Sequence, residues 1–268
     1  MEDSQQSSPT SSPASSSSKT ALSQLRDVVS SHGIALVRGV PINVAGTETL
    51  GLKFCGHLMS SIRGKTLWGI SIEDLDPDTL FPDLAYTVDG LPLHTDYVFS
   101  SYPPSLQLGS CQLKSLEGGA TNYVDGFAVA ERLRKEHPEA FEFFTKTSIT
   151  YQYIADGYHM VADGPIIRTD SLGEVVQMRY NDTYRAPLDY LSNDDVDRFY
   201  EHHKSLSEIM RDPSMVESII LEPGDTVIFN NHRALHARES YKGARRMVGC
   251  YIGKDEADSE ARLSGAHF

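Results

Sequence analysis

The stretch Leu93-His94-Thr95-Asp96-Tyr97 carries a histidine and an aspartate two residues apart. In an extended segment such residues point to one face, so the imidazole of His94 and the carboxylate of Asp96 would lie side by side. Two histidines and one carboxylate form the ligand set of the non-haem Fe(II) oxygenases. Because His-x-Asp is a common pair, the prediction of a metal site depends on a second histidine elsewhere in the chain.

Two histidines further along the chain can supply that ligand. His232 and His236 both lie in Phe229-Asn230-Asn231-His232-Arg233-Ala234-Leu235-His236, which ends a predicted strand at 226–229. A late strand that pairs near the first motif would bring either one to it, and spacing alone does not separate the two. His137 begins another His-x-carboxylate pair, but a helix start explains its Glu139.

Two adjacent arginines, Arg245 and Arg246, stand at the start of the next predicted strand. A 2-oxo acid needs a cation for its far carboxylate, and arginine offers a permanently charged, two-pronged donor for that purpose. Neighbouring residues of a strand face opposite ways, so only one of the two arginines can point into the protein.

Four aromatic residues form a further set: Trp68, Tyr86, Tyr97 and Tyr251. Aromatic side chains at such positions usually belong to the core. Gathered near a metal, however, they would form a box that attracts a quaternary ammonium group, with about 0.5–2 kcal/mol from each cation–π contact.

The pattern of elements predicts a mostly β protein with flanking helices and a double-stranded β-helix (jelly-roll, cupin-like) core. Alternating strands are expected at 105–113, 120–124, 226–229 and 246–252, and strands around a turn at 148–181. Helices are expected at 21–29 and 50–62, after Asp125, after Pro138 and after Ser192, whereas 66–86 reads as a loop. Residues 1–18 form a Ser/Pro-rich tail that we expect to be disordered.

Composition excludes several classes of partner. The net charge is −13 without a basic stripe, which argues against nucleic acid and is compatible with a cationic small substrate. No apolar run is long enough for a membrane span. Cys55, Cys111 and Cys250 lack zinc or disulfide spacing, and no targeting segment is evident, so we expect a reduced compartment, the cytoplasm.

The chain resembles the γ-butyrobetaine and trimethyllysine dioxygenases, within the wider taurine-dioxygenase-like group of Fe(II)/2-oxoglutarate enzymes. The resemblance runs through about residues 20–263, and it defines the predicted domain, residues 19–263. The matching segments are Ala85-Tyr86-Thr87, His94-Thr95-Asp96-Tyr97, Pro103-Pro104, Gly118-Gly119-Ala120-Thr121, Val124-Asp125-Gly126-Phe127, Arg179-Tyr180-Asn181, Pro223-Gly224-Asp225, 231–238 and Arg245 through Tyr251.

This resemblance implies the role of each site residue. His94, Asp96 and His236 match the iron ligands, since His232 falls where these families have a tryptophan. Arg245 and Thr121 match the residues that hold the far carboxylate of 2-oxoglutarate, which is used together with O2. Tyr86, Tyr97 and Tyr251, and Trp68 with a one-residue shift, match the aromatic positions around a trimethylammonium group, and Asn181 matches an asparagine that holds the substrate carboxylate.

The implied activity is hydroxylation of a small trimethylammonium carboxylate, most like γ-butyrobetaine to carnitine, because Tyr97 after the aspartate is typical of that branch. Two features depart from it: the N-terminal domain of typical animal γ-butyrobetaine dioxygenases is replaced by the short tail, and Arg63-Gly64-Lys65 stands where a cage tyrosine is usual. A cation there would repel the substrate if it pointed inward.

Three alternatives follow from the same residues. One is an Fe(II)/2-oxoglutarate hydroxylase or desaturase of trimethyllysine, another amine or a natural-product intermediate. Another, from a different class, is a non-catalytic binding or sensor protein on the same fold. For assembly, the alternative to a monomer is a homodimer.

Overall fold

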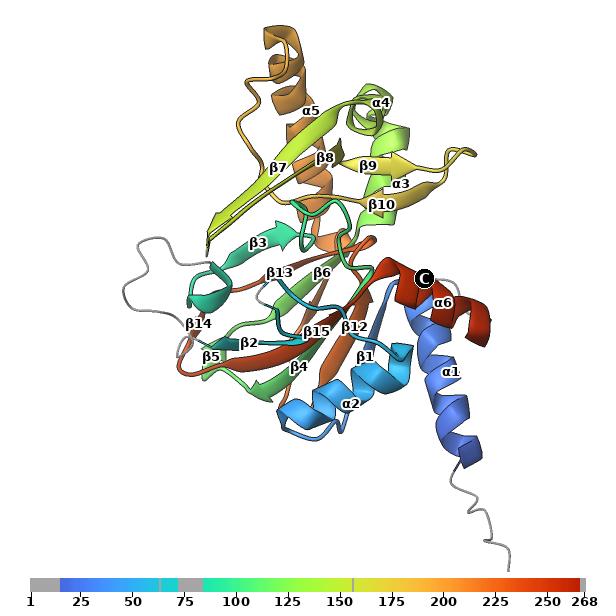
Figure 1. Cartoon of the computed structure of the whole chain (residues 1–268). Coiled ribbons are helices and arrows are strands. Elements are labelled where there is room, and N and C mark those ends of the chain that lie inside the picture. Colours follow the sequence, from blue (N-terminus) through green and yellow to red (C-terminus); the bar gives the residue numbers. More distant parts are fainter. Residues whose placement is uncertain (1–14, 63, 72–83, 156, 266–268) are drawn as a thin grey trace, which may run out of the picture.

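The computed structural model of the chain describes residues 15–62, 64–71, 84–155 and 157–265 (Figure 1). The described helices are α1 (Ser15–His32), α2 (Val44–Cys55), α3 (Gly126–Glu136), α4 (Pro138–Lys146), α5 (Asn193–Arg211) and α6 (Lys254–Ser264), with short 3-10 helices at η2 (Leu84–Tyr86) and η3 (Pro213–Met215). None of these helices is long and apolar enough to cross a membrane.

Two antiparallel sheets form the centre of the protein. The larger sheet has the strand order β1 (Ile34–Val37), β12 (Thr226–Asn230), β4 (Leu106–Leu113), β15 (Arg246–Ile252), β2 (Leu67–Ser71). The smaller sheet has the order β11 (Val216–Ile219), β6 (Thr121–Asp125), β13 (Ala234–Arg238), β3 (Leu91–His94). Two-stranded pairs are formed by β7 (Ser148–Ala155) with β8 (Tyr158–Pro165), β9 (Ile167–Thr169) with β10 (Val175–Met178), and β5 (Glu117–Gly118) with β14 (Tyr241–Lys242).

The two sheets pack face to face. Their shared apolar cluster combines Tyr123 and Ala234 of the smaller sheet with Val227, Phe229 and Met247 of the larger one. The rings of Tyr123 and Phe229 lie 5.4 Å apart between the sheets. Residues on the inner faces alternate with residues that point outward, as expected for strands buried on one face by a second sheet.

Helices cover the outer face of the larger sheet. Leu106, Leu108, Ile228, Cys250 and Ile252 point to that face and are buried against residues of α1, α2 and α6. A second apolar core joins α3, α4 and α5 to the β7–β8 and β9–β10 pairs, and these elements lie beyond one end of the two sheets (Figure 1). The site described below lies where this second unit meets the smaller sheet.

Most of the predicted elements are present. The strands at 105–113 and 246–252 correspond to β4 and β15, the helix after Ser192 is α5, and strands surround the turn before Gly173. The predicted helix caps are also correct, since Asp125 Oδ1 accepts from the backbone N–H groups of Phe127 and Ala128.

Four features differ from the sequence prediction. The second helix spans Val44–Cys55 rather than 50–62, because Asn43 caps its start and Gly56, at φ 76°, ends it. The expected loop at 66–86 contains β2 and η2, while residues 72–83 lie outside the described residues. Helix α6 was not predicted. The backbone is helical from Ser15, so the expected tail boundary at residue 18 falls inside α1; serine costs a helix only a few tenths of a kcal/mol more than alanine, roughly.

Candidate metal centre

Two adjacent strands of the smaller sheet bring two histidines together. His94 is the last residue of β3, and its cross-strand partner in β13 is His236. Directly opposed residues of an antiparallel pair point to the same face. The two imidazole rings therefore lie side by side, with 4.1 Å between their centroids.

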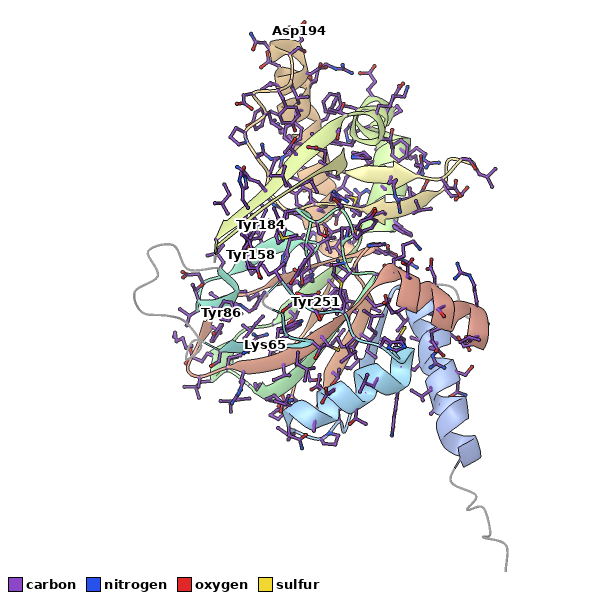
Figure 2. The ribbon with its side chains drawn as sticks, viewed as in Figure 1. Lys65, Tyr86, Tyr158, Tyr184, Asp194 and Tyr251 are labelled. Carbon is purple, nitrogen blue, oxygen red and sulfur yellow. The ribbon has the colours of Figure 1, made fainter. Side chains whose placement is uncertain are left out.

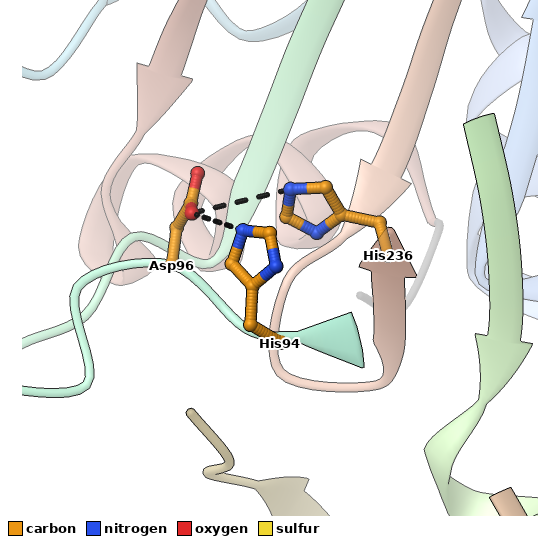
Figure 3. A group of neighbouring side chains, drawn as sticks. All are labelled: His94, Asp96 and His236. Atoms are coloured by element: carbon orange, nitrogen blue, oxygen red, sulfur yellow. Dashed lines mark ion pairs between the residues drawn. The ribbon is translucent and has the colours of Figure 1, made fainter. Parts of the chain in front are cut away.

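Asp96 completes the group from the turn that follows β3 (Figure 3). Its Oδ1 lies 3.2 Å from His94 Nε2 and 4.0 Å from His236 Nε2. One ligand atom from each of the three residues lies within 4.8 Å of the other two. The expected convergence of His94 and Asp96 is present, but it arises from a turn and not from alternation along a strand.

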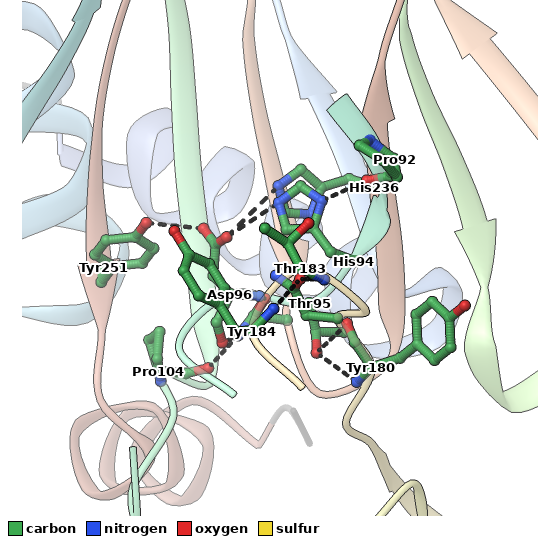
Figure 4. Close-up of polar contacts among 12 residues, drawn as sticks. Pro92, His94, Thr95, Asp96, Pro104, Tyr180, Thr183, Tyr184, His236 and Tyr251 are labelled. Carbon is green, nitrogen blue, oxygen red and sulfur yellow. Dashed lines mark hydrogen bonds and ion pairs between the residues drawn. The ribbon is translucent and has the colours of Figure 1, made fainter. Parts of the chain in front are cut away.

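The backbone of this turn is held from several sides. Asn231, which is 1% exposed, donates through Nδ2 to the carbonyl of Asp96 (3.1 Å) and accepts through Oδ1 from its backbone N–H (2.8 Å). Thr95 exchanges hydrogen bonds with the backbone of Tyr180, at 2.7 and 3.1 Å (Figure 4). Tyr97 adopts a left-handed backbone, φ 59°, which non-glycine residues adopt at a cost and which is typical of functional sites.

Hydrogen bonds also orient the side chains of the group. His94 Nδ1 lies 2.7 Å from the carbonyl of Pro92, so this nitrogen carries the proton and Nε2 is left as a lone-pair donor. The hydroxyl of Tyr251 donates to Asp96 Oδ2 at 2.8 Å (Figure 4). Both contacts leave the inward-facing atoms, His94 Nε2 and Asp96 Oδ1, directed at a common point.

The electrostatics of the group favour the protonation states that a cation needs. Burial opposes ionisation of Asp96, but hydrogen bonds and charge interactions with His94, His236 and Tyr251 outweigh it and lower the pKa of the carboxyl. Burial lowers the pKa of His236 to about 3, so its imidazole is neutral at physiological pH. Two imidazoles and a carboxylate fit a divalent ion of the first transition series.

The alternative ligand, His232, lies outside this group. Its Nε2 is 3.2 Å from the carbonyl of Pro103, and burial lowers the pKa of the ring to about 4. Among the described residues, only His94, Asp96 and His236 form a cluster of His, Cys, Asp or Glu that could hold a metal ion. The geometry thus separates the two histidines that sequence spacing left open.

Arg245 and Arg246 point in opposite directions, as the strand prediction requires. Arg246 is exposed, whereas Arg245 is 9% exposed, just before β15. The Arg245 guanidinium lies 5.7 Å from the Tyr241 ring and interacts electrostatically with Tyr123, the cross-strand partner of His236. No described residue forms a hydrogen bond or ion pair with this guanidinium, and burial lowers its pKa.

Thr121, the other residue predicted for the far carboxylate, is 9% exposed and lies two residues from Tyr123 along β6. The two side chains therefore share the inner face of the smaller sheet. Because Tyr123 also interacts with Arg245, the structure places Thr121 and Arg245 in the same inter-sheet region as His236.

Three of the four predicted aromatic residues form a row of rings beside the metal group. The Tyr251 ring lies 5.8 Å from the Trp68 ring and 5.1 Å, edge on, from the Tyr97 ring. Tyr86 belongs to η2, whose backbone carbonyls accept hydrogen bonds from Arg238, and Figure 2 shows it on the side of Tyr251 away from α1. Lys65 is exposed, and Arg63 lies outside the described residues.

Asn181 is buried beside the turn that carries Asp96, and its hydrogen bonds define the orientation of its side-chain amide. Its Oδ1 accepts from the backbone N–H groups of Thr183 and Tyr184, at 2.9 and 3.3 Å. The amide oxygen is thus used within the protein. No described residue accepts from Nδ2, which makes Asn181 a donor toward a ligand and not an acceptor.

Sequence reasoning missed three residues of this region. Asn231 was quoted only as part of a motif, although a buried asparagine beside a metal-ligand turn is a signal for a backbone clamp. Tyr184 extends the aromatic row through Phe99, whose ring lies 5.1 Å from Tyr184 and 5.4 Å from Tyr97. Gln107, the cross-strand partner of Tyr251, carries a buried Oε1 that has no hydrogen-bond partner among the described residues.

Gln107 Oε1 is not the only such atom between the sheets. Trp68 Nε1 is buried as well, and no described group accepts its hydrogen bond. A buried polar group without a partner costs about 1–3 kcal/mol. The Trp68 donor and the Arg245 guanidinium, which has no hydrogen-bond partner among the described residues, together indicate that the space between the sheets is built for an anionic ligand.

Comparison with known proteins places this geometry in context. Residues 4–251 match the family model "Taurine catabolism dioxygenase TauD, TfdA family". The mitochondrial trimethyllysine dioxygenase of Mus musculus is 33% identical, over 88% of this chain and 56% of that protein. The γ-butyrobetaine dioxygenase of Homo sapiens is 30% identical, over 86% of this chain and 60% of that protein, so the chain spans little more than half the length of these relatives.

Solved structures agree with the fold. The crystal structure of AAD-2 in complex with Mn(II) and N-oxalylglycine superposes with a TM-score of 0.69, at 14% identity, over 88% of this chain and 89% of that one. At this identity the likeness concerns the arrangement of helices and strands alone.

Proposed function

Because the chain belongs to the taurine catabolism dioxygenase TauD, TfdA family, we propose that it is an Fe(II)- and 2-oxoglutarate-dependent dioxygenase built on a jelly-roll core. The observation that carries this proposal is the convergence of ligand atoms from two imidazoles and one carboxylate within 4.8 Å of one another. His94, Asp96 and His236 hold the metal. When bound, Fe(II) couples the oxidative decarboxylation of 2-oxoglutarate by O2, which yields succinate and CO2, to oxidation of a substrate C–H bond.

Arg245 and Thr121 hold the far carboxylate of 2-oxoglutarate. The burial of Arg245 without a partner among the described residues supports this role, since an isolated buried cation is costly until an anion arrives. Arg245 gives a charge-assisted, two-pronged contact, and the Thr121 hydroxyl adds one more donor. Trp68 Nε1 offers a further hydrogen-bond donor in the same region.

The substrate is a small trimethylammonium carboxylate, with γ-butyrobetaine as the first candidate. The row of Trp68, Tyr97 and Tyr251 presents ring faces to a quaternary cation. Asn181 Nδ2, with its oxygen already used, donates to the carboxylate at the other end. Tyr86 completes the cage from η2. Binding at both ends fixes which carbon faces the metal and excludes water from the reacting centre.

Trimethyllysine is the second candidate. It shares the quaternary ammonium and the carboxylate, and the trimethyllysine dioxygenases of Mus musculus and Meyerozyma guilliermondii, at 33% and 34% identity, are more similar to this chain than the human γ-butyrobetaine dioxygenase at 30%. Trimethyllysine has a chain longer by two methylene groups and an additional α-amino group, from which the Asn181 oxygen, already used within the protein, does not accept a hydrogen bond.

Turnover of 2-oxoglutarate tests whether the chain is an oxygenase and whether its substrate carries a quaternary ammonium group. Succinate formation is measured with γ-butyrobetaine, trimethyllysine, other betaines and matched amines that lack the quaternary nitrogen, with the Asp96→Ala variant as the inactive control. We expect stimulation by quaternary compounds and none with the variant. Stimulation by the non-quaternary compounds alone would refute the aromatic cage and favour an oxygenase of another amine. Equal turnover by Asp96→Ala would refute the enzyme itself and favour a binding or sensor protein.

Two sequence-based predictions stay predictions. The cytoplasmic location is one, and the mouse relative carries "mitochondrial" in its name. Homodimer formation is the other. Sedimentation of the purified chain and microscopy of a tagged full-length chain check them directly.

A further inference from the structure

We propose that the hydroxyl of Tyr251 holds Asp96 as a one-oxygen metal ligand and so keeps a coordination position open for O2. This inference rests on the proposed function, because it assigns Tyr251 a positioning role at the same metal centre. It adds to the aromatic role expected for Tyr251, since that role needs only the face of the ring.

The two oxygens of Asp96 have different surroundings. Oδ1 faces the ring nitrogens, at 3.2 Å from His94 Nε2 and 4.0 Å from His236 Nε2. Oδ2 accepts the Tyr251 hydroxyl at 2.8 Å (Figure 4). By donating a hydrogen bond to Oδ2, the Tyr251 hydroxyl stabilises negative charge on that oxygen. It also holds Oδ2 away from the point where the three ligand atoms converge.

The number of Asp96 oxygens that bind the metal decides how many coordination positions remain for other ligands. His94, Asp96 and His236 would each supply one atom to the ion, and the proposed reaction needs the remaining coordination positions for 2-oxoglutarate and O2. If both oxygens of Asp96 bound the metal, one of these positions would be lost, and the cosubstrate and O2 would compete for the remainder.

Tyr251 is well placed for this task because elements other than the metal loop fix it. Its ring is packed against Trp68 and Tyr97, and its backbone carbonyl accepts from the N–H of Met59 at 2.8 Å. Tyr251 lies in β15 of the larger sheet, whereas Asp96 follows β3 of the smaller sheet. The hydrogen bond therefore spans the two sheets and fixes the Asp96 carboxylate against a rigid partner.

The variant Tyr251→Phe isolates the hydroxyl, because it keeps the ring and its packing. Tyr97→Phe is the matched control: its ring belongs to the same row, and its hydroxyl accepts from the backbone N–H of Ile62 at 3.0 Å. For all three full-length proteins, the affinity for Fe(II) without O2, the affinity of the Fe(II)-loaded protein for 2-oxoglutarate, and the visible spectrum of bound Co(II) are measured.

We expect the Fe(II)-loaded Tyr251→Phe variant to bind 2-oxoglutarate about tenfold to hundredfold more weakly than the parent, because Asp96 Oδ2 would be free to take a position that the parent leaves open. Its Co(II) spectrum should differ from that of the parent for the same reason. Tyr97→Phe should match the parent in 2-oxoglutarate affinity and in spectrum. Circular dichroism and thermal unfolding establish that both variants are folded.

Each other outcome has a definite meaning. Parent-like affinity for 2-oxoglutarate and a parent-like Co(II) spectrum in Tyr251→Phe would overturn the positioning role and leave the proposed function standing. An equal loss in both variants would also overturn it, because general loosening of the aromatic row would then explain the effect. Failure of the parent to bind Fe(II) and 2-oxoglutarate would overturn the proposed function and this inference together.

Discussion

At the scale of single residues, Arg245 combines burial with the lack of a partner among the described side chains. If it binds 2-oxoglutarate, Arg245→Gln should raise the half-saturating concentration of 2-oxoglutarate at least about thirtyfold, since a charge-assisted contact contributes about 2–3 kcal/mol. The ligand-free variant should be no less stable than the parent, because an uncompensated buried charge has been removed. Titration with 2-oxoglutarate and denaturant unfolding measure the two effects.

The neighbouring residue supplies the control for this prediction. Arg246 has the same chemistry but is exposed, so Arg246→Gln should leave the 2-oxoglutarate requirement unchanged. Equal weakening by both substitutions would mean that overall charge, and not a specific contact, is responsible.

His232 makes a separate prediction about pH. Burial lowers its pKa from 6.5 to about 4, so the unfolded chain binds a proton at this residue that the folded protein does not. Its effect on stability is absent above pH 6.5 and grows as the pH falls through 6.5 toward 4. There it lowers the free energy of unfolding by about 3 kcal/mol in total. In the metal-free protein, His232→Gln should therefore lose less stability than the parent over this range.

Urea unfolding at a series of pH values measures that difference. His236 also has a lowered pKa and acts in the same direction, but it is present in both proteins and cancels in the comparison. Parallel stability curves for parent and variant would contradict the prediction.

At this scale, the sequence predicts the relative orientation of neighbouring residues but not which residues of distant strands come together. Opposite orientation of Arg245 and Arg246 follows from strand alternation and was predictable. The choice between His232 and His236 was not derivable from spacing, because it depends on the register of β13 against β3. The Tyr251–Asp96 hydrogen bond joins positions 155 residues apart and has no local signal.

At the scale of elements, Gly249 sets how closely β15 and Trp68 can pack. A Cβ at this position would lie 2.1 Å from Trp68 Cζ2 and 2.2 Å from the backbone oxygen of Leu108, and the backbone oxygen cannot move aside. Gly249→Ala should lower the free energy of unfolding by about 1–3 kcal/mol through overpacking. The fluorescence of Trp68, the one tryptophan of the chain, follows the unfolding.

Gly109 is the matched control, since it is the cross-strand partner of Gly249. A Cβ there would approach Trp68 and Met247 no closer than 3.8 and 3.9 Å, which is ordinary contact. Gly109→Ala should change stability far less. A similar loss in both variants would show that glycine itself, and not the space beside Trp68, is required.

Helices α2 and α6 differ from the sequence prediction because neither shows a strong helical pattern. Helix α2 contains Gly46 and Gly51, which lower helix propensity; a Cβ at Gly51 would lie 2.9 Å from Cys250 Sγ, so glycine serves helix–sheet packing. Helix α6 buries only Ala257 and Ala261, and two alanines give a weak amphipathic pattern. Strands such as β4 were predictable because their apolar and polar residues alternate strongly.

At the scale of the whole molecule, the site joins the two sheets. The metal group lies on β3, β13 and the turn after β3 of the smaller sheet, whereas Arg245 immediately precedes β15 of the larger sheet and Tyr251 lies within it. A 2-oxoglutarate molecule bound as proposed would contact the metal at one end and Arg245 at the other. Ligand binding should therefore stabilise the packing of one sheet on the other, beyond what the metal alone does.

Thermal unfolding of the full chain tests this linkage. A ligand that binds only the folded state at about one hundred times its Kd adds about 2.7 kcal/mol, or roughly 5–10 °C in Tm for a chain of this size. Fe(II) without O2 should raise Tm, 2-oxoglutarate should raise it further, and 2-oxoglutarate alone should have little effect because half of its contacts are missing. Asp96→Ala should abolish both shifts. If 2-oxoglutarate alone raised Tm as much as it does with the metal, or raised it equally in Asp96→Ala, the cosubstrate would be binding independently of the metal group, and the two ends of the site would not be joined through it.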